Sequence, residues 1–290
     1  MKQLLILSGK GGTGKTTIAG AFIRLSKARG YADCDVDAPN LHLILKQEIE
    51  PKTRNFYGLA KASIETKKCI QCDLCLKHCR FEAVSVDGSG RYQIDLNSCE
   101  GCGVCAYICP AQAITLNDYI DGKLELFKSN DSVFSTAKLK MGSGTSGMLV
   151  SEVKKQLTPF KDNIDLAIID GSPGIGCPVI ASISGVDMVL IVAEPSLSGL
   201  SDMKRIITTA RKFETPIAAI VNRFDSNLDI TNLIEKYCRD EGILLLGKIP
   251  YDKQVIKAVN DGLTIVDVDC LAGREVEKVY FKTIEYLYSL

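Results

Sequence analysis

Two kinds of residue pattern in this chain are suited to chemistry. Eight of the twelve cysteines fall into two runs with identical spacing, and a stretch rich in glycine and lysine lies near the N-terminus. Thiolates at short, regular spacing bind iron or zinc, and glycine-rich turns expose backbone N–H groups that bind phosphate. The sequence therefore predicts a metal centre and an anion site in one chain.

The glycine-rich stretch, residues 8–17, lies between two apolar runs, Leu4–Leu7 and Ile18–Ile23. A strand, a turn and a helix in that order are the context that the phosphate-binding pattern G-x-x-x-x-G-K-[ST] requires. In such a loop we expect Lys15 to bind the β- and γ-phosphates of ATP, and the Thr16 hydroxyl to ligate Mg²⁺. The residues of this stretch predicted to bind the nucleotide are Gly9, Gly11, Gly12, Thr13, Gly14, Lys15, Thr16 and Thr17.

Carboxylates suited to Mg²⁺ follow other segments of the chain. Asp170 ends the apolar run Ile164–Ile169, which is the pattern of a strand that presents an aspartate to a magnesium-bound water. Asp33, Asp35 and Asp37 occupy alternating positions. Alternation on a strand end predicts that these side chains point the same way, where they would hold the Mg²⁺ shell and orient the attacking water. A plain acidic loop is the alternative interpretation.

The segment Lys10–Thr17 resembles the deviant phosphate loop (K-G-G-x-G-K-T-T) of the MinD/ParA superfamily of ATPases. The resemblance covers nearly all of residues 1–50 and 130–290. It implies that Lys10 crosses a homodimer interface and touches the partner's nucleotide, and that Asp35 supports hydrolysis. The residues expected to act in catalysis are therefore Lys10, Lys15, Asp35 and Asp170.

The resemblance also implies adenine contacts in the second half of the chain. Asn222 and Arg223 follow a predicted strand, Pro216–Val221, and the asparagine amide can both donate to and accept from a base. Pro250 and Asp252 lie after the next predicted strand and resemble the second base-flanking loop of the superfamily.

The sequence departs from the superfamily pattern before its first acidic residues. Only Tyr31 and Ala32 separate Gly30 from Asp33, which leaves little room for the usual second strand. Either this strand is short or the first helix ends early, near Ser26.

The cysteine runs have the spacing of bacterial two-cluster ferredoxins, whereas zinc more often takes two C-x2-C knuckles. The runs are Cys69-x2-Cys72-x2-Cys75-x3-Cys79 and Cys99-x2-Cys102-x2-Cys105-x3-Cys109. In such ferredoxins the fourth cysteine of each run serves the other cluster. The resemblance thus implies two [4Fe–4S] clusters, one on Cys69, Cys72, Cys75 and Cys109 and the other on Cys99, Cys102, Cys105 and Cys79. Electron transfer is the favoured role of these clusters. The alternative is that the clusters only stabilise the fold of a small domain.

Apolar strands that alternate with helices predict an α/β fold, a doubly wound and mostly parallel sheet of the P-loop NTPase type. A small α+β domain of the bacterial ferredoxin type is predicted as an insertion. The predicted boundaries are 1–58 for the first part of the ATPase domain, 59–120 for the ferredoxin-like domain and 121–290 for the second part.

Composition narrows the partners and the location. The chain has 35 Lys and Arg and 35 Asp and Glu, so no overall charge attracts it to nucleic acid or to anionic lipid. No stretch approaches a membrane-spanning length, and the amphipathic C-terminal run from Glu275 to Leu290 is expected to pack on the domain. We therefore predict a cytoplasmic protein, where twelve cysteines indicate metal rather than disulfides.

These patterns favour an ATP-dependent redox protein, which passes electrons through its clusters by a logic similar to that of the nitrogenase iron protein. An iron–sulfur cluster carrier or assembly ATPase of the Mrp type is the alternative, and a positioning ATPase similar to MinD is a weaker one. Cys177 lies seven residues after Asp170, the offset of a cluster ligand in the nitrogenase iron protein, so it either binds a bridging cluster or is a small buried thiol. The loop Met141–Gly147 either faces the nucleotide or is a linker.

Overall fold

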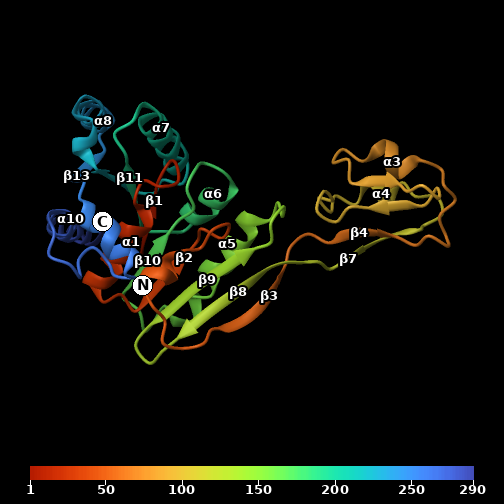
Figure 1. Cartoon of the computed structure of the whole chain (residues 1–290), viewed down its shortest axis with the longest axis horizontal. Coiled ribbons are helices and arrows are strands. Elements are labelled where there is room, and N and C mark those ends of the chain that lie inside the picture. The colour runs from red at the N-terminus through yellow and green to blue at the C-terminus, as the bar shows by residue number, and fades with distance from the viewer.

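The apolar runs of the sequence form one nine-stranded sheet in a computed structural model that describes all 290 residues (Figure 1). In spatial order its strands are β13 (Leu244–Ile249), β12 (Ile217–Asn222), β11 (Met188–Ala193), β1 (Lys2–Leu7), β10 (Leu166–Asp170), β2 (Gly30–Asp33), β9 (Val133–Leu139), β8 (Ile120–Lys128) and β3 (Lys52–Tyr57). The strands from β13 to β9 pair in parallel, whereas β8 pairs antiparallel with both β9 and β3. The prediction of a mostly parallel α/β sheet is confirmed.

Helices cover both faces of this sheet. One face carries α1 (Lys15–Ser26), α2 (Leu41–Ile44), α9 (Lys253–Asn260) and α10 (Leu271–Ser289). The other face carries α5 (Ser146–Lys155), α6 (Cys177–Ile183), α7 (Leu197–Arg211) and α8 (Leu228–Asp240). Two short 3₁₀ turns are η1 (Thr158–Phe160) and η2 (Phe224–Ser226).

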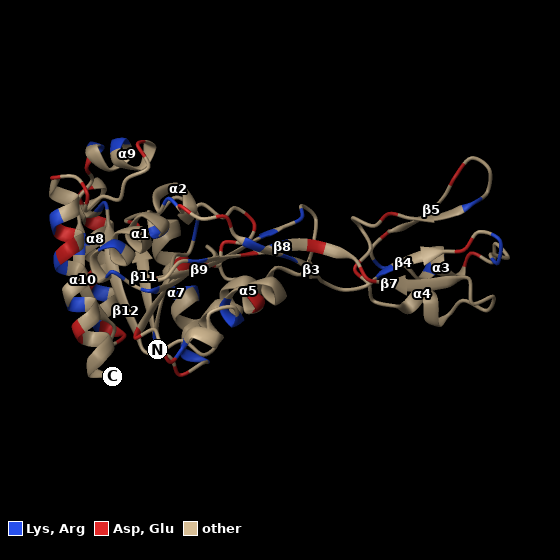
Figure 2. Ribbon diagram, turned by 90° about the horizontal axis from the view of Figure 1, so that it is seen from below, with Lys and Arg blue, Asp and Glu red and all other residues tan.

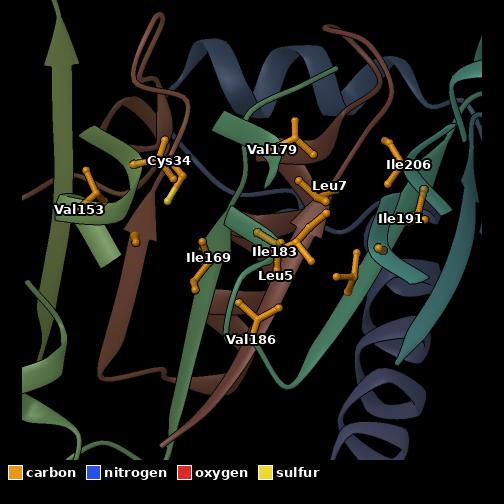
Figure 3. Packing of buried hydrophobic residues seen from close by; sticks show 14 of the residues in the cluster. Leu5, Leu7, Cys34, Val153, Ile169, Val179, Ile183, Val186, Ile191 and Ile206 are labelled. Carbon is orange, nitrogen blue, oxygen red and sulfur yellow. The ribbon is translucent and has the colours of Figure 1, made fainter. Parts of the chain in front are cut away.

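The central strand β1 divides its side chains between the two helical layers. Leu5 and Leu7 pack with Val179 and Ile183 of α6 on one face (Figure 3), whereas Leu4 and Ile6 join the cluster on the face of α1 and α10. This division follows from the strand period of two. Because both faces are covered, all four positions are apolar, and each buried side chain contributes about 1.5–3 kcal/mol.

The segment from α1 to β2 shows whether the second strand is short or the first helix ends early. Helix α1 ends at Ser26, and Lys27 then takes a left-handed conformation with φ of 49°. Strand β2 begins at Gly30 and has only four residues, all buried. Both expectations therefore hold, and the strand still pairs with β10 and β9 because its short run is completely apolar up to Asp33.

A small unit projects from the edge of the sheet at β3 and β8 (Figures 1 and 2). Its elements are β4 (Lys61–Ile64), α3 (Leu74–His78), β5 (Val84–Val86), β6 (Tyr92–Ile94), α4 (Val104–Tyr107) and β7 (Ile114–Asn117). Strands β4 and β7 pair antiparallel, as do β5 and β6. Seven apolar residues of this unit are buried: Ala62, Ala83, Val84, Tyr92, Cys99, Ala113 and Ile114. Four of them, Ala62, Ala83, Cys99 and Ile114, form one cluster.

The surface has no single dominant charge. Basic and acidic side chains alternate over the helices of the sheet body and over the small unit (Figure 2). The apolar face of α10 is buried through Val276, Val279 and Leu287, so the expected packing of this helix on the domain is confirmed. None of the helices is both long enough and apolar enough to cross a bilayer.

Candidate functional site

The turn between β1 and α1 has the backbone that a phosphate loop needs. Gly12 and Gly14 adopt positive φ of 78° and 91°, a conformation that side-chain-bearing residues rarely take. A Cβ atom on Gly14 would lie 2.3 Å from the Asn222 amide nitrogen, so only glycine fits. Helix α1 begins at Lys15, and its free N-terminal N–H groups face the turn.

A cavity of about 470 Å³, the phosphate-loop cavity, opens beside this turn. It lies at the carboxyl ends of the parallel strands, the usual ligand position in open α/β sheets. The expected nucleotide residues that line it are Gly11, Gly12, Gly14, Lys15, Thr16, Thr17, Asp35, Asn222, Arg223, Pro250 and Asp252. The expected residues outside its lining are Gly9, Lys10, Thr13 and Asp170.

Lys15 and Asp170 form a buried ion pair at the floor of this region. Lys15 Nζ lies 2.6 Å from Asp170 Oδ1, and the two side chains are 6% and 0% exposed. Burial opposes the charged ammonium, but the charge and hydrogen bond of Asp170 outweigh it, so the pKa of Lys15 is raised. Asp170 Oδ2 and the Thr13 hydroxyl are buried without a hydrogen-bond partner. Such orphaned oxygens fit a site that takes a magnesium ion with its water shell.

The acidic segment after β2 differs from the expected alternation. The strand ends at Asp33, and the chain then turns, so Asp33, Asp35 and Asp37 do not share one direction. Asp35 lines the phosphate-loop cavity, whereas Asp37 is exposed. Asp33 is fully buried and accepts the backbone N–H groups of Asp35, Asn40 and Leu41 at 2.9–3.0 Å.

Asp33 thus fixes the turn that carries Asp35. Burial raises the pKa of Asp33 to about 7, and the charge of Asp170 acts in the same direction, while the Leu41 N–H and Lys15 oppose them. Burial also raises the pKa of Asp35, against the effect of Lys15. Of the three carboxylates, Asp35 is the one positioned to face a ligand.

The expected adenine-binding residues form the far wall of the same cavity. Asn222 Nδ2 donates to the Thr13 carbonyl at 2.7 Å, and Arg223 donates to the Gly12 carbonyl, so both side chains brace the phosphate loop. Asp252 caps α9 by accepting the N–H of Gln254 at 2.9 Å. The sequence did not indicate the apolar part of this wall, which consists of Ile249, Val255, Ile256, Val259 and Ile265.

The eight cysteines of the small unit surround two separate cavities. The first cysteine cavity is lined by Cys69, Cys72, Cys75 and Cys109, and the second by Cys79, Cys99, Cys102 and Cys105. The structure therefore gathers the cysteines into the same two groups of four that the ferredoxin resemblance implies. Most of the other lining side chains are apolar.

No three His, Cys, Asp or Glu side chains converge closely enough to hold a single metal ion. Cys72 and Cys102 are exposed at the rims, whereas Cys99 is buried.

The sequence comparisons bear on this arrangement. Residues 4–265 match the CobQ/CobB/MinD/ParA nucleotide binding domain. The chain belongs to this family. An uncharacterized protein of Methanocaldococcus jannaschii is 30% identical over 98% of this chain and 97% of its own length. The iron–sulfur cluster carrier protein of the same organism is 24% identical over 98% of this chain and 84% of its own length.

A solved structure of the same fold is the septum site-determining protein MinD of Pyrococcus horikoshii in complex with Mg-ADP. It superposes with a TM-score of 0.59 at 17% identity and covers 98% of this chain and 96% of its own. This likeness supports the assignment of a mostly parallel P-loop NTPase fold to the present chain.

Lys10, the early lysine of the MinD/ParA loop, points away from its own phosphate-loop cavity. Lys10 Nζ lies 3.2 Å from Ser196 Oγ, 3.4 Å from Ser198 Oγ and 3.5 Å from a Glu194 carboxylate oxygen. Glu194 and these serines follow β11, and the sequence did not single them out as lysine partners. Lys10 is thus held by side chains of its own chain and does not line the phosphate-loop cavity.

Cys177 and the loop 141–147 also differ from the expectations. Cys177 is exposed at the first position of α6, so it is not a buried thiol. Cys34 is completely buried, and burial raises its pKa to about 12, which makes it unsuitable as a second surface ligand. The loop 141–147 does not line the phosphate-loop cavity and is instead in contact with Cys177 and with the small unit.

Proposed function

We propose that this chain is an ATP-hydrolysing iron–sulfur protein that couples nucleotide-driven changes to electron transfer through two [4Fe–4S] clusters. The observation that carries the proposal is the pair of four-cysteine cavities in a small unit attached to the sheet of a nucleotide-binding family member. An ATPase domain does not need cysteine cavities, and a ferredoxin-like unit does not need a nucleotide site. Their presence in one chain is the reason to expect that nucleotide binding and electron transfer are coupled.

The thiols and walls of the small unit suit this role. Four cysteines around each cavity supply the complete ligand set of a cubane cluster, with no need for a partner protein. When bound, such a cluster would accept and donate one electron at a time. The apolar wall formed by Ile64, Tyr92 and Ile114 at the first cavity shields the thiols from water and so favours permanent rather than labile binding.

The phosphate-loop cavity suits Mg·ATP. Lys15 would leave Asp170 to meet the β- and γ-phosphates, which frees the Asp170 carboxylate for the magnesium shell beside Thr16. Asp35 would orient the attacking water. Lys10 would complete the site of a second copy, so the functional unit is proposed to be a homodimer in the cytoplasm.

The deciding experiment begins with anaerobic purification and iron analysis. The proposal expects about eight iron atoms per chain, that is, two cubane clusters, and ATP-dependent reduction of a low-potential acceptor. Electron paramagnetic resonance with and without Mg·ATP then reports coupling. Zinc in place of iron, or identical redox behaviour in both nucleotide states, would contradict it.

A second candidate is an iron–sulfur cluster carrier, because relatives at 22–29% identity have that name. A carrier needs a labile, accessible ligand, and exposed Cys177 is the thiol outside the two cavities that meets this need. Transfer of a cluster to an apo-protein, lost on Cys177→Ser, would favour the carrier. A positioning ATPase similar to MinD leaves the cysteine cavities without a purpose. We propose no nucleic-acid partner and no membrane insertion.

A further inference from the structure

The loop 140–147, which joins β9 to α5, is in contact with the second cysteine cavity. The Glu100 carboxylate lies so close to Gly144 that a Cβ atom on this glycine would be 2.8 Å from Glu100 Oε2. Glu100 directly follows Cys99 and lines the second cavity. A charged side chain is thus held between the loop and the thiols.

A second set of contacts leads from the same loop to the same cavity. Lys61 is buried, and its ammonium donates to the backbone carbonyl of Cys99. The ring of Tyr119 lies 5.8 Å from Lys61 Nζ and 4.6 Å from Lys140 Nζ, so it connects the two lysines. Two independent contacts therefore join the loop to the backbone around Cys99.

The other end of the loop is in contact with α6, which follows a segment that lines the phosphate-loop cavity. A Cβ atom on Gly147 would lie 3.1 Å from Cys177 Cβ, so the starts of α5 and α6 touch. The segment before Cys177 contains Pro173, which lines the phosphate-loop cavity. Next to it, the Gly174 N–H donates to the Ser8 carbonyl of the phosphate loop at 3.1 Å.

These contacts form one continuous path from the phosphate loop to the second cysteine cavity, and the thiols of the first cavity take no part in it. We infer that nucleotide binding changes the reduction potential of the cluster in the second cavity alone, with Glu100 and Lys61 as the residues that transmit the change. The inference rests on the proposed function, because it presumes that both cavities hold clusters.

The charges give the physical reason. A carboxylate beside a cluster opposes the arrival of an electron, and a buried ammonium favours it. A small shift of the loop changes the distance of Glu100 from the second cavity, and such a change of distance matters because the walls are apolar. The first cavity has its acidic lining residue at a different position of the cysteine run, Asp73, which accepts a hydrogen bond from the Tyr92 hydroxyl and pairs with Lys77 within the small unit.

The test is a potentiometric titration of the fully loaded protein, followed by electron paramagnetic resonance, with and without a non-hydrolysable Mg·ATP analogue. Lys61→Gln and Asp73→Asn assign the two transitions, because each alters the charge beside one cavity. We expect the nucleotide to shift the transition that responds to Lys61→Gln by at least tenfold in its equilibrium constant, about 59 mV for one electron. The transition that responds to Asp73→Asn should stay in place.

A loop variant tests the path itself. Gly144 does not have a positive φ, so Gly144→Val adds bulk without backbone strain and displaces only the flexible end of Glu100. It should abolish the nucleotide-induced shift while leaving nucleotide affinity unchanged. Gly88→Val, at a position in the small unit with open space around it, is the matched control and should keep the shift.

Iron content and nucleotide affinity are measured first, so the two proposals fail separately. Fewer than two clusters would overturn the proposed function. Two clusters with a shift in the Asp73-sensitive transition, or in both transitions equally, would overturn only the present inference. No shift in either transition would overturn both proposals. Hydrogen exchange gives a second readout: nucleotide should alter protection in residues 98–103 and 140–147 and leave residues 69–76 unchanged.

Discussion

Lys15 Nζ lies 2.6 Å from Asp170 Oδ1 although the two residues are 155 positions apart in the chain. The pair neutralises two buried charges while no ligand is bound. Asp170 Oδ2 has no hydrogen-bond partner, so this carboxylate can still bind a metal ion. We expect the ion pair to separate when Lys15 binds a phosphate group and Asp170 binds the metal ion.

Lys15→Gln is expected to abolish Mg·ATP binding and to lower stability. Removing one member of a buried pair leaves the other charge uncompensated, at a cost of about 3–5 kcal/mol. Thermal melts measure both effects. Wild-type protein at a hundredfold excess of ligand over Kd should gain about 2.7 kcal/mol, and the variant nothing. Lys212→Gln, an exposed control, should melt like the wild type.

Asp35→Asn and Asp33→Asn should have different effects. Asp35 lines the cavity, so its variant should bind ATP with near-normal affinity and hydrolyse it more than tenfold more slowly. Asp33 holds three backbone N–H groups, so its variant should lose about 1–3 kcal/mol of stability. Phosphate release and denaturant melts separate the two roles, with exposed Asp37→Asn as the control. Equal loss of turnover in all three variants would contradict this assignment.

Lys10→Ala should prevent ATP-dependent dimerisation while leaving nucleotide binding by the single chain nearly intact, because Lys10 does not line its own cavity. Glu194→Gln is the informative companion. It frees Lys10 from its partner within the chain and should preserve or strengthen the dimer. Light scattering after size-exclusion chromatography, with and without Mg·ATP, measures the mass. A Lys10→Ala protein that still dimerises with ATP would refute a role across the interface.

Removal of iron should unfold the small unit and spare the sheet body. Seven buried apolar residues form the core of the small unit, whereas the two hydrophobic clusters on the faces of the sheet contain 32 and 27 buried residues. A core of about seven side chains cannot offset the ordering of some sixty residues without further cross-links such as metal clusters. Limited proteolysis after chelation should therefore cut between residues 59 and 119, and the cut protein should still bind nucleotide. Equal protection of iron-free and loaded protein would show that the unit is stable by itself.

Cys72→Ser and Cys177→Ser distinguish resident ligands from a bridging site. Cys72 lines the first cysteine cavity, so its loss should remove about half of the iron. Cys177 lies on the surface of α6, outside both cavities, and its variant should keep about eight iron atoms per chain. Iron and sulfide analysis of both variants, in dimeric protein, decides between these outcomes. Loss of iron from the Cys177 variant would support a cluster shared between two chains.

The sequence was most informative where a contact depends on local order. The strand, turn and helix around Lys15 were predictable because apolar runs flank the glycines, and Asp170 was predictable because it ends such a run. The division of the cysteines into two groups was implied by the ferredoxin resemblance, in which the fourth cysteine of each run joins the other group, and the two cavities are lined by the same groups.

Contacts between distant segments were not predictable. Nothing in the sequence relates Lys10 to Glu194 or Glu100 to Gly144, because these pairs meet only after the sheet is assembled. The expected alternation of the acidic residues was wrong because β2 ends at Asp33, whose carboxylate satisfies backbone groups of the following turn. Of the two alternatives for the loop 141–147, the linker agrees with the structure, because the loop joins β9 to α5 and does not line the phosphate-loop cavity.

The register of the outermost strands has a further consequence. Tyr57 of β3 is the partner of Ile120 of β8, so the chain leaves the sheet and returns to it at adjacent positions. A segment whose two ends are neighbours can be gained or lost in a single genetic event without disturbing its host. A short turn from Tyr57 to Ile120 would close an ordinary hairpin, and the same junction could accept a different electron-carrying module. The small unit is thus a detachable accessory of this nucleotide-binding scaffold.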